Sequence, residues 1–286
     1  MQQTALYSFI IPVALSIIML GLGISLTLAD FKRVVLFPKA VLVGLSCQIL
    51  LLPPIGFALC HIFSLPPELA VGLMLLAASP GGATANLFSH LAKGDIALNI
   101  TLTAINSLLS LFTMPLVIHW AMQHFMAHDQ QIPLVFDKII QVFAIVLGPV
   151  GIGMAIRAAK PELAGVLDKP VRSLSTAFLV LMVVAAMIKE WENLPSFLKQ
   201  VGLATLVFNL ASMAVGYLVP LALGLARKQA VAIGMEIGIH NVTLAIYLAG
   251  TLLGNSVMSI PPAIYSLVMF FTASLFGIRM ARKANG

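Results

Sequence analysis

The chain has 286 residues, of which 60% are hydrophobic and 9% are charged. Soluble domains carry about a quarter charged residues, so this composition excludes a water-soluble globular fold and predicts a membrane protein. The net charge of +6 comes from basic residues between apolar segments. Such residues suit contact with anionic lipid headgroups and give no reason to expect a nucleic acid partner.

Apolar segments long enough to cross a bilayer, about 20 residues each, follow one another along the chain. We therefore expect an all-α polytopic membrane protein with about nine transmembrane helices, in which residues 1–286 form a single transmembrane domain. In chain order, the expected helices are residues 5–28, 40–62, 69–92, 96–125, 133–156, 172–188, 201–224, 229–253 and 259–278.

The basic residues predict the orientation of these helices. All of them except Lys138, Lys189 and Lys199 fall in every second loop or at the C-terminus. Because loops rich in lysine and arginine remain in the cytoplasm, we expect a multi-pass protein of the cell (inner) membrane. Its N-terminus would lie outside and its C-terminus in the cytoplasm.

Polar side chains recur inside two helices of the first half. Gln48 lies in the middle of helix 40–62, and Asn99, Thr103 and Asn106 share one face of helix 96–125. Their oxygens are suitable ligands for a hard cation such as sodium. The alternative is that such residues only join helices by hydrogen bonds. We expect that simpler role for Asn209, Thr113, Tyr217, Tyr265 and Thr272.

Two of the expected helices are interrupted in the middle of the membrane. Helix 69–92 contains the run Ser79-Pro-Gly-Gly82, and helix 229–253 contains Glu236-Ile-Gly-Ile-His-Asn241. Non-helical backbone at this depth is tolerated only where it is buried in protein or lines a cavity. A simple proline kink is the alternative for the first run, but the pairing of two breaks favours a common site.

Glu236 is the only acidic residue inside a long apolar segment. A carboxylate at the bilayer centre costs about 2.5–3.5 kcal/mol on insertion scales, so such a group usually faces a polar cavity and binds something. A protease is not expected, because no second intramembrane acid and no zinc motif accompany Glu236. A channel filter built from a ring of like residues is not expected either. We expect no enzyme activity.

The two broken helices are five crossings apart and therefore run in opposite directions. Residues 5–125 and 172–278 can then form two inverted repeats, with 133–156 as a linking helix. Many secondary transporters use this plan, in which broken helices meet near the midplane and bind substrate and coupling ion.

With these motifs, the sequence resembles the bile acid:sodium symporter family. The resemblance rests on Ser79-Pro-Gly-Gly-Ala-Thr-Ala-Asn86, on the segment from His90 to Thr103, and on Glu236-Ile-Gly-Ile-His-Asn241, and it covers nearly the whole chain. It implies a nine-helix member with a panel domain and a core domain of crossed, broken helices. It also implies sodium-coupled symport of an organic anion, bile-acid-like or a small carboxylate, by alternating access. Sodium would be the coupling ion, and neither another cofactor nor a protein partner is implied.

The resemblance also implies two sodium sites that share Glu236. Asn86, Thr103 and Asn99 would serve the first site, and Gln48 with the carbonyls of Ile237 and Ile239 would serve the second. The residues expected to face the substrate are Asn241, Thr84, Ala83 and Gly82.

Three positions depart from the family pattern. Ala85 and Asn99 stand where serines are usual, and His240 stands where a glutamine supplies an oxygen. An imidazole nitrogen is a poor sodium ligand and titrates near physiological pH. Two alternatives follow: the second site holds sodium without a side-chain oxygen from residue 240, or His240 and Glu236 form a protonatable pair. The chain would then be a proton-coupled carrier or an efflux carrier of related architecture.

Overall fold

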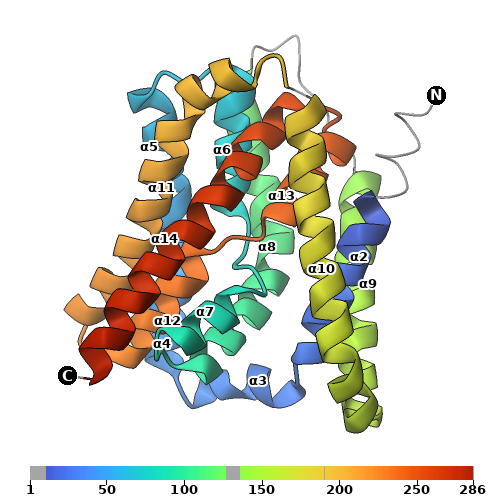
Figure 1. Ribbon diagram of the computed structural model, residues 1–286, viewed down its shortest axis with the longest axis vertical. Helices are drawn as coiled ribbons and strands as arrows, with labels where there is room; N and C mark the ends of the chain where they lie inside the picture. The colour runs from blue at the N-terminus through green and yellow to red at the C-terminus, as the bar shows by residue number, and fades with distance from the viewer. Residues whose placement is uncertain (1–10, 127–135, 190, 286) are drawn as a thin grey trace.

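The computed structural model describes residues 11–126, 136–189 and 191–285, and these form helices joined by short loops (Figure 1). Parts of the expected helices 5–28 and 133–156 lie outside the described residues. The helices are α2 Ile11–Ser25, α3 Leu28–Lys32, α4 Pro38–Ser46, α5 Leu52–Ile62, α6 Pro67–Ala78, α7 Ala85–Leu91, α8 Ile96–Phe125, α9 Phe136–Ala159, α10 Pro161–Lys189, α11 Leu194–Ala222, α12 Arg227–Gly238, α13 Val242–Tyr247 and α14 Ile260–Asn285.

The all-helical polytopic membrane fold expected from the composition is confirmed. Within the described ranges, four helices are long and apolar enough to cross a membrane. A fifth candidate is the pair Pro12–Ser25 and Leu28–Val35, which is bent by 70°. Shorter apolar helices occupy other expected crossings, notably Pro67–Ala78 and Val242–Leu252. Their length falls short of a full span because breaks divide them, so the total of nine crossings stays a prediction.

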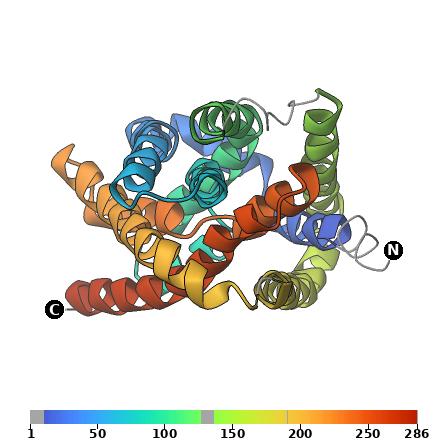
Figure 2. The same cartoon turned by 90° about the horizontal axis from the view of Figure 1, so that it is seen from above.

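The helices pack in two groups. The three-helix group consists of α2, α9 and α10, with α2 packed against both of the others. The crossover group contains α4 to α8 and α11 to α14. In the view from above, the three helices of the first group stand together at one side of the molecule (Figure 2). Few contacts join the groups, chiefly those of α2 with α13 and of α10 with α14.

The boundary between α9 and α10 differs from the expected one. Helix α10 begins at Pro161, directly after Lys160, whereas hydropathy placed the start of this span at residue 172. Charged residues such as Asp168 and Lys169 are unfavourable inside a bilayer but compatible with a helix that extends into water. The expected segment 172–188 is therefore part of a longer helix, and hydropathy missed the residue at which that helix begins.

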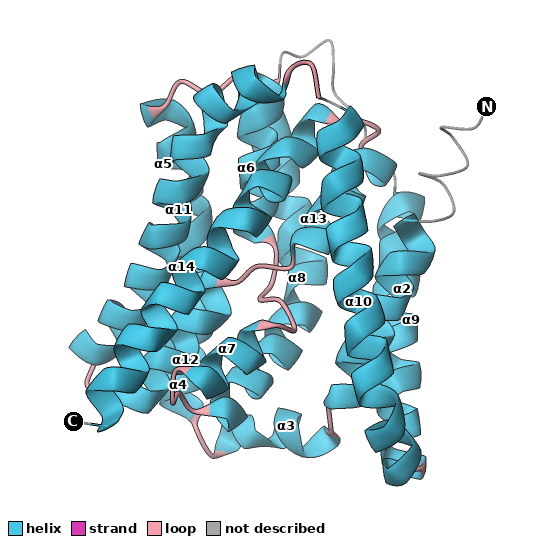
Figure 3. Cartoon of the chain, viewed as in Figure 1, coloured by secondary structure: helices cyan, strands magenta, loops and turns pink. Residues whose placement is uncertain are grey.

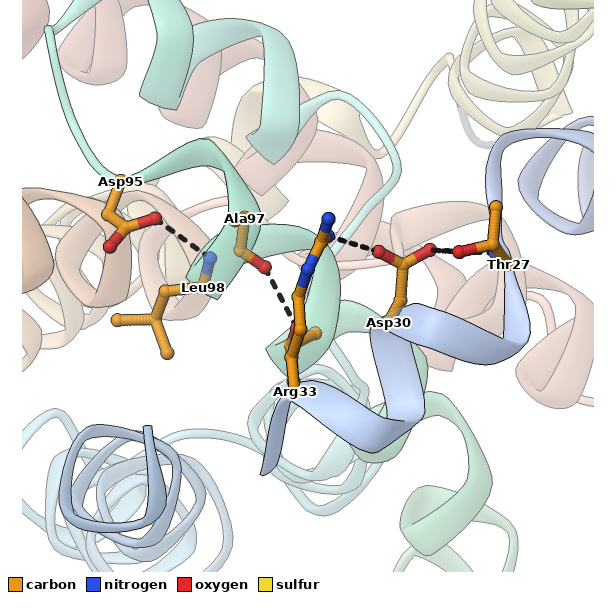
Figure 4. Close-up of polar contacts among 7 residues, drawn as sticks. Thr27, Asp30, Arg33, Asp95, Ala97 and Leu98 are labelled. Carbon is orange, nitrogen blue, oxygen red and sulfur yellow. Dashed lines mark hydrogen bonds and ion pairs between the residues drawn. The ribbon is translucent and has the colours of Figure 1, made fainter. Parts of the chain in front are cut away.

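A polar cluster holds the bend between the two groups. Thr27 precedes α3, and its N–H and hydroxyl both donate to Oδ2 of the buried Asp30 at 2.7 Å. Arg33 forms an ion pair with the other carboxylate oxygen. Figure 4 shows Asp30 and Arg33 beside the first turn of α8, where Asp95 accepts a hydrogen bond from the N–H of Leu98. The connection is thus a capped turn and not a loose linker.

Close packing of α2 on α9 depends on glycine. A methyl group at Gly153 would lie 2.5 Å from the carbonyl oxygen of Leu20 and 2.6 Å from the amide nitrogen of Ile24. We expect Gly153→Ala to destabilise the protein by about 1–3 kcal/mol through overpacking, measured as a lower thermal unfolding midpoint in detergent. The matched control is Gly151→Ala on the same helix, where a methyl group meets nothing within 4 Å. Equal midpoints for the two variants would contradict this packing.

Candidate functional site

The two helix breaks cross each other in the middle of the molecule. Gly81 and His240 pair as an isolated antiparallel bridge. The N–H of Gly82 donates to the carbonyl of Ile239 at 2.7 Å, and the N–H of Asn241 donates to the carbonyl of Pro80 at 2.8 Å. Figure 3 shows both breaks as loops at the centre, between α6 and α7 and between α12 and α13. The expected crossover therefore exists, and each break satisfies backbone groups of the other.

The local sequence explains why the first break forms here. Pro80 has no N–H to continue α6. At Gly81, a methyl group would overlap Oε1 of Glu236 and lie 2.8 Å from the carbonyl oxygen of the same residue. Only glycine lets the backbone approach the carboxylate this closely.

The second break depends on residues for which the sequence predicts only hydrogen bonds between helices. The carbonyl of Gly238, the last residue of α12, accepts hydrogen bonds from Nδ2 of Asn209 and from the hydroxyl of Tyr265, both at 2.9 Å. Thr272 in turn donates to Oδ1 of Asn209 at 2.5 Å. These side chains replace the helical partner that Gly238 lacks. In the sequence these residues stand out only as polar residues inside apolar helices. Their spacing along the chain does not relate them to the break.

Glu236 lies at the crossover and is 1% exposed. Its Oε2 accepts a hydrogen bond of 2.6 Å from the hydroxyl of Thr103, and its Oε1 has no hydrogen-bond partner. No ion pair found among the described residues joins Glu236 to a basic side chain. A buried carboxylate in this state is unfavourable unless a cation or a proton joins it.

The helices that pack against α12 carry further buried oxygen atoms. Helices α7, α8 and α12 pack pairwise against one another and carry Asn86, Asn99 with Thr103, and Glu236 respectively. Asn99 donates through Nδ2 to the carbonyl of Ala232 at 2.8 Å, which leaves its Oδ1 buried and without a partner. Oδ1 of Asn86 is likewise buried and unpartnered. Buried polar atoms nearly always have a hydrogen-bond partner, so these unpartnered oxygens indicate that the site binds a ligand.

Gln48 and His240 lie at the other side of the crossing. Gln48 belongs to a π-helical turn, Cys47–Leu51, that precedes Pro53 in α5. Its Nε2 donates to the carbonyl of Ser79 at 2.8 Å, and its Oε1 is buried without a partner. The ring nitrogens of His240 lie 3.0 Å from the carbonyl oxygen of Leu76 and 2.8 Å from that of Ile237. None of the hydrogen bonds found in the described part of the chain joins His240 to Glu236.

The residues expected to face the substrate surround the crossing. Ala83 is exposed and Thr84 half-buried, although Gly82 and Ala85 on either side are buried. Asn241 is 8% exposed, and its Oδ1 accepts a hydrogen bond from the N–H of Leu244, which caps α13. The structure thus places the expected substrate-facing residues at one crossover. Ala83 is the exposed residue among them.

The unpartnered oxygen atoms at the crossing are suited to a hard cation. The unpartnered atoms at the crossing are carboxylate and amide oxygens, the ligands that hard cations prefer. No group of three or more His, Cys, Asp or Glu that could hold a metal ion occurs in the ranges that the structure describes. Transition metals are usually held by such groups, with histidine nitrogen and cysteine sulfur as common ligands.

These features define a polytopic helical membrane protein in which two broken helices cross at a buried carboxylate. The sequence profile of the Sodium Bile acid symporter family matches residues 12–197. The chain therefore belongs to this family, as the motifs indicated. Symporters move solutes without transforming them, which agrees with the expectation that the chain is not an enzyme.

Similar proteins carry related descriptions. The probable chloroplastic sodium/metabolite cotransporter BASS1 of Oryza sativa subsp. japonica is 26% identical over 89% of this chain, which spans 62% of that protein. The uncharacterized sodium-dependent transporter YocS of Bacillus subtilis (strain 168) is 27% identical over 96% of the chain and 84% of its own length. The human ileal sodium/bile acid cotransporter is 25% identical, with 96% and 80% covered.

Proposed function

We propose that the chain is a sodium-coupled symporter of an organic anion. The observation that carries this proposal is Glu236, a buried carboxylate with one oxygen unpartnered and no basic neighbour among the described residues. A cation that binds there removes the unfavourable isolated charge. The names of similar proteins support sodium as that cation, since each of the three reported above is described as sodium-dependent or as a sodium cotransporter.

In this proposal Glu236, Asn86, Asn99 and Thr103 hold the coupling ion. Thr103 already contacts the carboxylate, and the two asparagines each supply an amide oxygen with no protein partner. Asn99 supplies an amide oxygen where a serine is usual, and the site lacks the one ligand that a serine in place of Ala85 would provide. Sodium is here a transported substrate and not a resident cofactor.

The tip of the crossover would face the organic anion. Gly82, Ala83, Thr84 and Asn241 lie around the crossing, and Ala83 is the exposed member of the group. Bile acids and other metabolites are the substrates named for similar proteins. A carboxylate or sulfonate that meets the crossover would bind after the cation has neutralised Glu236, which links the two affinities reciprocally.

Transport would proceed by alternating access, with the core rocking against the panel in a chain built from two inverted repeats, residues 5–125 and 172–278, joined by helix 133–156. The separation of the three-helix group from the crossover group supports such rocking, because few contacts would have to change. We place the protein in the cell's inner membrane, with its N-terminus outside, on the distribution of basic residues.

The proposal is tested by thermal unfolding of the purified protein as choline is replaced by sodium at constant ionic strength. A ligand that binds only the folded state stabilises it by about 2.7 kcal/mol at 100 times its Kd. We expect a saturable rise of the midpoint with sodium and none with potassium. Uptake of labelled taurocholate and of small carboxylates into proteoliposomes under a sodium gradient then identifies the anion. If a pH gradient drives uptake and sodium changes neither readout, the chain is a proton-coupled carrier.

A further inference from the structure

The unpartnered oxygens are distributed unequally around Glu236. On the side of α7 and α8, Asn86 and Asn99 each present a buried amide oxygen without a partner. On the side of α4 and α5, Gln48 is the one described residue that does so. The proposed function concerns the first side, and the second side calls for a separate explanation.

His240 occupies that second side. It is 1% exposed, and the rings of Phe208 and Tyr265 pack against its imidazole with centroid distances of 5.7 and 5.3 Å. One ring nitrogen lies 2.8 Å from the carbonyl oxygen of Ile237 and the other 3.0 Å from that of Leu76. The two aromatic rings make edge contacts with the imidazole, and both of its nitrogens face carbonyl oxygens, of which a neutral imidazole can donate a hydrogen bond to one.

This placement leaves fewer oxygen ligands on the second side. The imidazole nitrogen lies 2.8 Å from the carbonyl oxygen of Ile237 and takes up one of the two lone-pair directions of that oxygen. The carbonyl of Ile239 already accepts the N–H of Gly82 at 2.7 Å. Among the described side chains on this side, Oε1 of Gln48 is the buried oxygen left without a partner, and a hard cation needs several oxygens. The residues present do not fit a second sodium ion.

We propose that the imidazole of His240 permanently occupies the second cation position, so that this chain binds a single sodium ion. The inference rests on the proposed function, because it concerns the stoichiometry of the same site. It does not depend on the protonation of His240: either form presents ring nitrogens and no oxygen to the two carbonyls. His240 is thus a positioning residue that links Ile237 of α12 to Leu76 of α6 across the crossing.

The test is the number of sodium ions bound per chain, measured by equilibrium binding of radioactive sodium to the purified full-length protein. We expect one ion per chain for the wild type, with a hyperbolic sodium dependence of thermal stabilisation. His240→Gln replaces the ring by an amide oxygen and frees the carbonyl of Ile237. This variant is expected to bind two ions and to show a sigmoidal dependence.

Two further variants make the result specific. His240→Leu removes the nitrogens without adding an oxygen and should keep one ion per chain. His119→Gln, an exposed histidine on α8, should also behave as the wild type. Two ions in the wild type would overturn the inference while leaving sodium coupling intact, and so would one ion in folded His240→Gln. Absence of sodium binding to the wild type would instead contradict the proposed function.

Discussion

Replacing Glu236 by glutamine is expected to abolish the stabilisation of the protein by sodium. The amide keeps the shape and one oxygen but removes the charge that compensates the cation in a buried site. We expect at least about a 100-fold loss of sodium affinity, which corresponds to about 2.7 kcal/mol. Equilibrium sodium binding and the midpoint of thermal unfolding with and without sodium measure the effect.

The same substitution should act in the opposite direction when sodium is absent. Glu236 must then carry an uncompensated buried charge or take up a proton, and glutamine avoids both because it is neutral. Glu236→Gln is therefore expected to be at least as stable as the wild type in choline. Glu68→Gln, in the first turn of α6, is the matched control and should respond to sodium like the wild type. A Glu236→Gln protein with unchanged sodium affinity would refute the assignment of the cation site.

Replacing Gly81 by alanine should disturb the site from the backbone side. The added methyl group would overlap Oε1 of Glu236, and it would lie 2.8 Å from the carbonyl oxygen of that residue. The carboxylate must move, and the antiparallel contact with His240 must widen. Overpacking of this kind costs about 1–3 kcal/mol, and displacement of the ligand should weaken sodium binding by at least about tenfold.

The appropriate control is Gly234→Ala, two residues before Glu236 on α12. There the nearest atom to an added methyl group is Cβ of Tyr217 at 3.4 Å, an ordinary contact. Sodium binding and thermal midpoints of the two variants should therefore differ clearly. If Gly81→Ala binds sodium as well as Gly234→Ala does, the close approach of the first break to Glu236 has no functional role.

The narrow connection between the two helix groups bears on the mechanism. The 70° bend between α2 and α3 is capped by Thr27 and Asp30, so movement of the three-helix group would be transmitted through a defined turn. Few other contacts join the groups. This arrangement suits rocking of one rigid body against another more than deformation within either.

The sequence by itself determined the membrane class, the approximate helices and the identity of the crossing segments. Hydropathy is a property of local composition, and the proline, glycines and glutamate that interrupt two apolar runs are visible without a structure. Membership of the family followed from the same motifs. The start of α10 at Pro161 could not be found this way, because hydropathy marks the bilayer and not the helix.

Only the tertiary structure decided which polar groups have partners. Asn209 and Tyr265 bond to the carbonyl of Gly238 from α11 and α14, an arrangement that no spacing within either helix could indicate. Likewise, the ring nitrogens of His240 lie beside the carbonyl oxygens of Leu76 and Ile237. No hydrogen bond found among the described residues joins this ring to Glu236, which lies one helical turn earlier in the sequence. Satisfaction of a buried atom depends on groups distant along the chain, so it appears only when the helices are packed.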